Sequence, residues 1–261
     1  MFIGYNLKIE SFFTPATEKY YFNIGKRMYK KYSVQVEENL ENLVLKNGNI
    51  DGGKMAESWF PQVRADIFLS HSHKNEKLAI AFAGYLNHHF GLITFVDSCI
   101  WGYSENLLRL LDNKYCLKKK NSYSYDKRNF TTSAVNMILS TGLNKMIDKC
   151  ECLFFLNTPS SISIESEVKL ATLSPWIYAE VEMTKIIRKK TLSHYRQIRR
   201  ETKLFSKGNK MLNEAIEFPM SIEHLKVIDS QKILDWKESY NDEEFPLDVL
   251  YYLTVDNYLF D

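Results

Sequence analysis

The segment SPWIYAE combines an aromatic ring and a carboxylate in a way that could support chemistry. Ser174 and Pro175 are favoured at the N-cap and at the first position of a helix, so they predict a helix start. With about 100° of rotation per residue, Trp176 and Met183 both fall within about 60° of Glu180 on that helix. A carboxylate on such an apolar stripe must be paired, protonated or used in a reaction.

The next glutamate along this helix, Glu182, has a different setting. It falls on the opposite side, close to Lys185 and Lys189, as is typical of a solvated helix face. Two interpretations remain for Glu180 at this point. In the first, Glu180 caps a neighbouring loop or pairs with a buried basic residue. In the second, it lines a pocket in which a ring of the ligand stacks on Trp176.

The elements that must position these residues alternate between strand and helix. Short apolar runs predict strands, and segments with apolar residues three and four apart predict helices. The predicted strands are 65–70, 92–97, 152–158 and 224–230, and the predicted helices are 74–90, 104–114, 133–150, 174–190, 230–240 and 246–255. Strands without polar alternation, each followed by a helix, indicate a parallel sheet with both faces covered.

Ligands of such sheets gather beyond the carboxyl ends of the strands. That rule selects the loops 70–76, 97–104 and 158–175, the last of which leads into SPWIYAE. The first loop contains HSH, but histidines two residues apart in a loop lack a third ligand. We therefore predict no metal site.

The rest of the chain predicts appended segments around one domain. Residues 1–63 are expected to form a partly helical N-terminal extension that ends in the linker NGNIDGG, and 64–230 the α/β domain. Residues 231–261 are expected to form a helical tail, and the polar stretch 117–132 an exposed loop.

Composition excludes several classes of protein. The net charge of +2 gives no reason to expect nucleic acid or a membrane as a partner, and no run of 18 apolar residues predicts a spanning helix. The start of the chain lacks the pattern of a signal peptide. The four cysteines form no CxxC pair and are expected to be buried thiols. These features predict a cytoplasmic protein.

Three segments together resemble the TIR (Toll/interleukin-1 receptor) domain family. ADIFLSHSHKNEKLAIAFAGYL is similar to the family's first strand, loop and helix, and TFVDSCIWGYSENLLRLLD to its second strand and the loop after it. SPWIYAE resembles the S-x-W-x-x-x-E signature. The resemblance covers roughly residues 65–190 and implies a flavodoxin-like fold, with a central five-stranded parallel sheet and helices on both faces.

The resemblance implies an enzyme that consumes NAD+ as its substrate and needs no cofactor. Such TIR proteins, among them bacterial ones, break the nicotinamide–ribose bond and release ADP-ribose or a cyclic ADP-ribose-type messenger, and the glutamate of the signature, here Glu180, is the catalytic residue. The remaining contacts implied for the substrate come from the first loop, the end of the second strand, the second loop and the signature helix: Ser70, His71, Ser72, Asp97, Trp101 and Trp176.

Chemistry agrees with that implication, and other interpretations stay open. Nicotinamide leaves as a neutral base, and one carboxylate can stabilise the positive charge that develops on the ribose. Ser72 and Asn75 could instead cap the first helix, and Asp97 could only fix its loop. A TIR module that only binds partners, or a deoxyribosyltransferase-like enzyme with a nucleophilic glutamate, are the alternatives.

The resemblance also implies a setting and partners. We expect antiviral defence against phage, self-association of the domain, and a separate sensor or downstream effector protein.

Overall fold

The computed structural model describes residues 1–31, 40–47, 49–96, 98–119, 122–165, 169–172, 174–198 and 218–255. The helices are α1 (Pro15–Lys31), α2 (Gly52–Trp59), α3 (Glu76–Phe90), α4 (Ser98–Leu111), α5 (Tyr125–Lys149), α6 (Pro175–Ile186), α7 (Leu192–Ile198), α8 (Ser230–Ser239) and α9 (Pro246–Thr254), with short turns η1 (Leu40–Leu43), η2 (His73–Asn75) and η3 (Asp112–Cys116). No helix in these ranges is long and apolar enough to cross a membrane.

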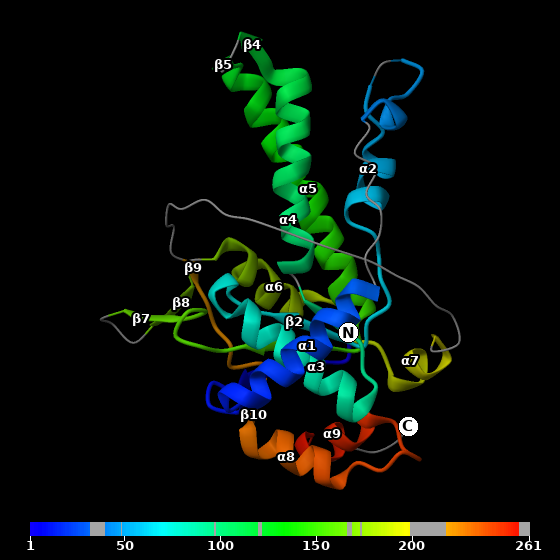
Figure 1. Cartoon of the computed structure of the whole chain (residues 1–261), viewed down its shortest axis with the longest axis vertical. Helices are drawn as coiled ribbons and strands as arrows, with labels where there is room; N and C mark the ends of the chain where they lie inside the picture. Colours follow the sequence, from blue (N-terminus) through cyan, green and yellow to red (C-terminus); the bar gives the residue numbers. More distant parts are fainter. Residues whose placement is uncertain are drawn as a thin grey trace.

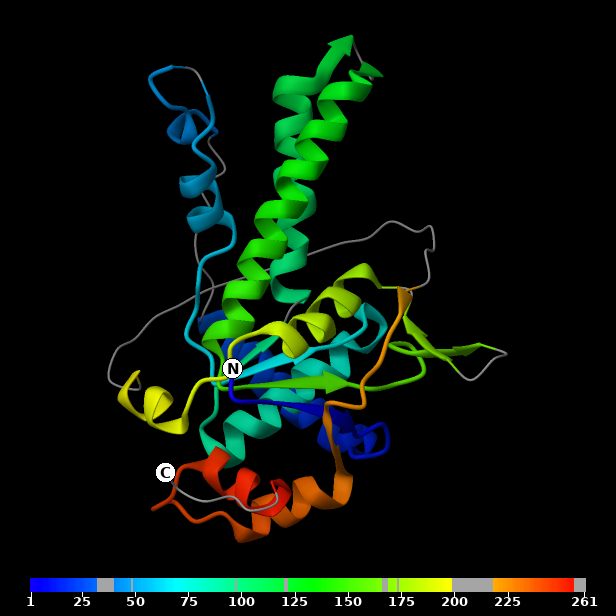
Figure 2. The ribbon, with the colours of Figure 1, turned by 180° about the vertical axis from the view of Figure 1, so that it is seen from behind.

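A five-stranded parallel sheet forms the centre of the molecule. The apolar runs predicted a parallel sheet and four of these strands. Its strands are β1 (Ile3–Lys8), β2 (Ile67–Ser70), β3 (Thr94–Val96), β6 (Cys152–Leu156) and β10 (Lys226–Asp229). They lie in the order β10-β1-β6-β2-β3. Side chains from one face of the sheet form a core with α1, α3, α8 and α9, and those from the other face form a core with α4, α5 and α6. Figures 1 and 2 show these helices on both sides of the sheet. Helix α2 joins the second core through its contacts with α4 and α5.

The first strand was not predicted, because residues 1–63 were expected to form an extension. β1 instead lies inside the sheet and pairs with both β6 and β10. Its sequence IGYNLK alternates Tyr5 and Leu7 with Gly4 and Asn6, so it lacks the continuous apolar run that marks the other strands. Packing at Gly4 is close, since a Cβ there would lie 2.6 Å from the Cδ2 methyl of Leu225, whose side chain would have to shift.

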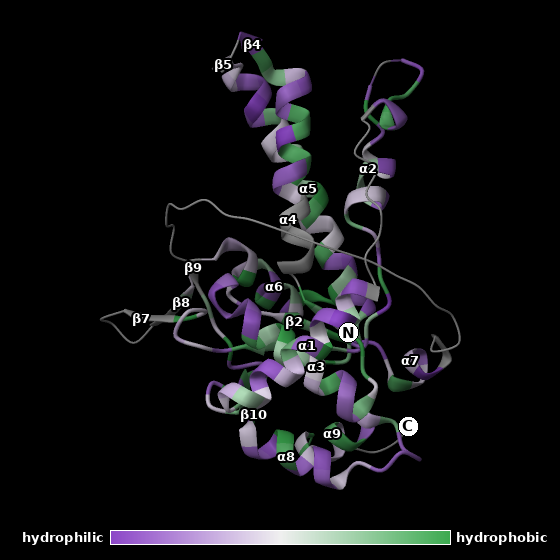
Figure 3. Ribbon diagram, viewed as in Figure 1, coloured by the Kyte–Doolittle hydropathy of each residue, from purple (hydrophilic) through white to green (hydrophobic). Residues whose placement is uncertain are grey.

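Most described residues of 117–132 are exposed, as predicted, but the prediction that they form a loop is wrong. β4 (Leu117–Lys119) and β5 (Ser122–Tyr123) form a two-stranded tip, and α5 already begins at Tyr125. Helices α4 and α5 run together as a hairpin that projects from the sheet (Figures 1 and 2). Its outer end is largely hydrophilic (Figure 3), which explains why composition alone predicted a loop.

Buried polar contacts hold the outer end of this hairpin. Asp112 is buried and accepts hydrogen bonds from Arg128 Nε (2.7 Å) and from Thr131 Oγ1 (2.7 Å). The predicted helix at 104–114 also begins earlier, at Ser98, so the backbone that was expected to form the second loop is helical.

A small antiparallel sheet follows β6. It consists of β7 (Ser163–Glu165), β8 (Lys169–Thr172) and β9 (Phe218–Pro219), in the order β7-β8-β9. The third predicted loop, 158–175, therefore contains two strands.

Replacing Gly84 with alanine is expected to lower the free energy of unfolding by about 1–3 kcal/mol, because overpacking forces backbones apart. Helices α1 and α3 cross so closely that a Cβ at Gly84 would lie 2.0 Å from the carbonyl oxygen of Tyr21. Gly52 is the matched control, since nothing lies within 4 Å of a Cβ there. Urea unfolding measures both, and equal stability of the two variants would contradict this packing.

His89 is expected to make stability depend on pH. Burial holds its pKa at about 4, below the usual 6.5, with Lys237 and His88 acting in the same direction. The Tyr21 hydroxyl lies 2.8 Å from its Nε2. The unfolded chain therefore binds one proton more than the folded protein between pH 6.5 and about 4.

Stability should consequently fall as the pH decreases through that window, and the contribution should be complete above it. Urea unfolding across the window tests this expectation. In His89→Gln the decrease should be smaller than in the wild type, and an identical pH profile of the two proteins would show that His89 is not the group responsible.

Candidate functional site

Helix α6 begins as its sequence predicted. Ser174 is the N-cap, its Oγ accepts a hydrogen bond from the backbone N–H of Ile177 (3.2 Å), and Pro175 is the first helical residue. Ile177 and Val181 are buried in the core between α6 and the sheet. This start fixes which side of α6 faces the sheet.

The two glutamates of α6 lie in the different settings that the helical spacing predicted. Glu182 is partly exposed and forms an ion pair with Lys185 (Oε1–Nζ 2.5 Å). Glu180 is only 2% exposed, and both of its carboxylate oxygens are inaccessible to solvent. A carboxylate is rarely buried to this extent, because removing its charge from water is costly.

The packing of α6 on β1 locates Glu180 along the sheet. Thr184 Cβ would lie 3.9 Å from a Cβ at Gly4, so these positions face each other. Figure 2 shows α6 running opposite to the strands. One helical turn back from Thr184 is Glu180, and two residues on from Gly4 is Asn6, on the same face of the strand. This register places Glu180 toward the carboxyl end of the sheet.

The C-terminal part of α6 contacts the loop that precedes β10. Thr184 Oγ1 lies 2.6 Å from Nε2 of His224. Burial lowers the pKa of His224, and Lys185 lowers it further. A neutral imidazole at this point is consistent with the hydroxyl contact.

Polar side chains cluster at the carboxyl ends of β1 and β6. Asn157 Nδ2 donates a hydrogen bond to Asn6 Oδ1 (2.9 Å). By the pairing of β1 with β6, both residues lie on the side of the sheet that α6 covers. Thr158 and Ser161 are buried, with their hydroxyl oxygens 3.2 Å apart. Sequence reasoning did not select these four residues. The available signal was the position of Asn157 and Thr158 directly after an apolar strand.

The loops after β2 and β6 are tied to each other. Asn75 Nδ2 donates a hydrogen bond to Thr158 Oγ1. Between these two strands the chain order reverses, since β3 lies on one side of β2 and the later strand β6 on the other. Such a switch point is the usual ligand position in an open α/β sheet.

The first-loop residues lie at this switch point. Ser70 is fully buried at the end of β2, and within the described residues its hydroxyl has no hydrogen-bond partner. His71 is 2% exposed. Ser72 and Asn75 were the alternative helix caps, yet neither side chain makes a capping hydrogen bond. The side chain of Asn75 instead bridges to the β6 loop.

The remaining predicted residues are not brought together by the described structure. Asp97 lies outside the described residues. The backbone of Trp101 belongs to α4 rather than to a loop, and its side chain is not described. Trp176 is partly buried and packs against the core on the α6 side of the sheet. No metal-binding group of three His, Cys, Asp or Glu side chains occurs among the described residues.

Two described grooves lie elsewhere, along α5. One has a volume of ≈ 570 Å³ and is lined by the ends of α5 and α6, including Lys145, Asp148 and Lys190. The other, of ≈ 540 Å³, lies between α2 and α5 and includes Phe60 and Lys145. Neither of them includes Glu180 or the loop after β2.

The register thus places one buried carboxylate toward the same end of the sheet as several hydroxyl and amide groups. Hydroxyl and amide groups are the kind that hydrogen-bond polyhydroxylated ligands, and a carboxylate is the kind of group that stabilises a positive charge developing beside it. In comparisons with models of protein families, with curated proteins and with solved structures, nothing was found that matches this chain.

Proposed function

We propose that this protein cleaves NAD+ at the bond between nicotinamide and ribose. The observation that carries the proposal is the burial of Glu180, at 2% exposure, on the sheet side of α6, while Glu182 two residues later is partly exposed and paired with a lysine. The resemblance of SPWIYAE to the TIR signature assigns the catalytic role to the same residue. The buried carboxylate of α6 and the glutamate of the signature are thus the same residue.

The proposed step breaks the C1′–N bond, and its electron pair moves to the nicotinamide ring. Glu180 would hydrogen-bond the ribose hydroxyls and stabilise the oxocarbenium-like charge. Water then attacks C1′ to give ADP-ribose, or the adenine ring attacks it to give a cyclic product. Ser70 and His71, at the end of β2, would contact the ribose and phosphate portion, and Trp176 would pack against a ring.

The strand order supports the proposal in part. The order β3-β2-β6 corresponds to the 2-1-3 portion of a flavodoxin-like sheet. On the other side of β6 the neighbouring strand is β1, the first strand of the chain, rather than a strand that comes after β6 in the sequence. The proposed TIR-like part is thus the unit from β2 to α6.

The experiment is incubation of the purified protein with NAD+, followed by chromatography of the products. We expect nicotinamide together with ADP-ribose or a cyclic isomer in equal amounts. The assay is repeated at increasing protein concentration, because we also propose that the domain self-associates. In cells, the proposed role in phage defence predicts loss of NAD+ or appearance of the cyclic product during infection.

The projecting hairpin favours a second candidate function, a module that only binds partner proteins. Its outer part exposes several large apolar side chains: Leu117, Tyr123, Tyr125, Phe130 and Met137. Exposed apolar clusters mark interaction surfaces. Partner binding that persists in Glu180→Gln, without NAD+ turnover by the wild type alone or with that partner, would favour this function.

A further inference from the structure

The outer end of the α4–α5 hairpin is strongly basic. Residues 112–130 contain six Lys and Arg residues but only two Asp residues, although the whole chain carries a net charge of only +2. Lys118, Lys119 and Lys127 are exposed, and none of them forms an ion pair within the described residues. The basic tip, defined as these three lysines, therefore presents uncompensated positive charge.

Apolar side chains accompany these lysines. Leu117 is 49% exposed, Tyr125 78% and Phe130 76%. Arg128 and Lys114 lie nearby, but each is already paired, with Asp112 and Glu41 respectively. The tip thus combines exposed lysines with apolar side chains that are exposed to solvent in a single copy of the chain.

The opposite end of the molecule has the opposite charge. Residues 235–248, from the last turns of α8 through the connection to the first turn of α9, contain six Asp and Glu residues and one Lys residue. Glu238, Asp242 and Glu243 are exposed, and none of them forms an ion pair within the described residues. We call these three residues the acidic pole. Tyr252, on α9 at this end, is 72% exposed.

We propose that the basic tip of one copy binds the acidic pole of a second copy. The hairpin and the α8–α9 end lie at opposite ends of the long axis (Figures 1 and 2), so the two surfaces do not meet within one copy. Three exposed cations then face three exposed anions, none of which forms an ion pair within the described part of the chain, and exposed aromatic side chains lie on both sides. Because different surfaces meet, the contact is heterologous and builds open chains or rings rather than a closed dimer.

This assembly is independent of the proposed reaction, since neither surface includes a residue of the Glu180 site. The resemblance to TIR domains implies self-association without saying which surfaces meet. The proposal names those two surfaces. Charge attraction between the two poles is screened by salt, with a Debye length of about 10 Å at 0.1 M and about 3 Å at 1 M.

Sedimentation velocity of the full chain tests the proposal. At low salt the average mass of the wild type should rise above 30.7 kDa with concentration, and it should return toward that value at high salt. The tip variant Lys118→Glu/Lys119→Glu/Lys127→Glu and the pole variant Glu238→Lys/Asp242→Lys/Glu243→Lys should each stay monomeric. An equimolar mixture of the two should associate again, because the complementary charges are restored.

A matched variant, Lys54→Glu/Lys145→Glu/Lys149→Glu, changes the same charge at exposed lysines away from the tip and should associate like the wild type. All the substituted side chains are exposed, so circular dichroism should show unchanged folding. A wild type that stays monomeric at low salt, or association that persists in the tip variant, would overturn the proposal. Glu180→Gln should associate normally, which separates this outcome from failure of the proposed reaction.

Discussion

Glu180→Gln is expected to reduce nicotinamide release from NAD+ by at least about 100-fold, the effect of losing one preorganised electrostatic group in an active site. Glutamine has the size and shape of glutamate but no charge, so it cannot stabilise the positive charge that develops on the ribose. The change should appear mainly in kcat, because the charge develops only in the transition state.

Glu182→Gln is the matched control for this prediction. It makes the same chemical change two residues away, at a partly exposed side chain whose contact is the ion pair with Lys185. Exposed pairs of this type contribute little to stability, so its activity should equal that of the wild type. Thermal unfolding of both variants checks that each protein is folded. Equal loss of activity in the two variants would show that Glu180 has no special role.

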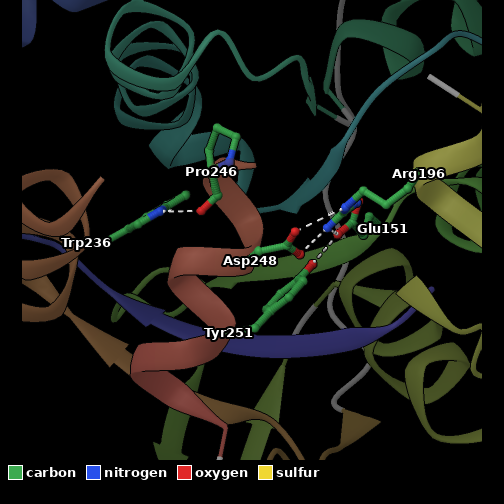
Figure 4. A network of polar contacts seen from close by, with 6 residues as sticks. All are labelled: Glu151, Arg196, Trp236, Pro246, Asp248 and Tyr251. Carbon is green, nitrogen blue, oxygen red and sulfur yellow. Dashed lines mark hydrogen bonds and ion pairs between the residues drawn. The ribbon is translucent and has the colours of Figure 1, made fainter. Parts of the chain in front are cut away.

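Arg196→Ala is expected to lower the free energy of unfolding by about 3–5 kcal/mol, the cost of breaking a buried ion pair from one side. The Arg196 guanidinium joins α7 to the start of β6 and to α9 (Figure 4). It donates to Glu151 Oε2 (2.7 Å) and Oε1 (2.8 Å), and it also pairs with Asp248. Glu151 is only 4% exposed, so its charge would be left buried.

The hydrogen bonds of Arg196 and Tyr251 to Glu151 predict how much stability each variant of this network loses. Burial alone would lower the pKa of Arg196, but the hydrogen bonds to Glu151 and Asp248 raise it, so the guanidinium stays charged. Tyr251→Phe removes one donor to Glu151 (3.0 Å) and should cost about 2 kcal/mol. Urea unfolding measures both variants. A smaller loss for Arg196→Ala than for Tyr251→Phe would contradict the proposed role of the ion pairs.

The sequence was most informative where one physical signal dominated. Continuous apolar runs predicted β2, β3, β6 and β10, and N-cap and proline signals predicted the start of α6. The predicted helix 74–90 also ends where glycine permits the left-handed conformation, since the C-cap of α3 is Gly91, with a φ of 64°. In these segments local propensity and tertiary packing favour the same structure, so a local pattern is sufficient.

Prediction failed where tertiary packing overrode local composition. β1 alternates Gly4 and Asn6 with apolar residues, so it did not resemble a buried strand. At Gly4 the side chain of Leu225, far away in the sequence, occupies the space that a larger residue would need. At the outer end of the hairpin, Arg128 and Thr131 donate hydrogen bonds to the buried carboxylate of Asp112, 16 and 19 residues earlier in the chain. A local sequence pattern does not reveal contacts over that separation. The site shows the same limit: helical spacing separated Glu180 from Glu182, but no pattern joined Asn6 to Asn157 across two strands.

The most direct test of the account is the rate of nicotinamide release from saturating NAD+ by the wild type, Glu180→Gln and Glu182→Gln, measured side by side at the protein concentration at which the wild type is most active. The account predicts turnover by the wild type and by Glu182→Gln, and a rate at least about 100-fold lower for Glu180→Gln. Turnover by Glu180→Gln at the rate of the wild type would contradict the assignment of Glu180 as the catalytic residue.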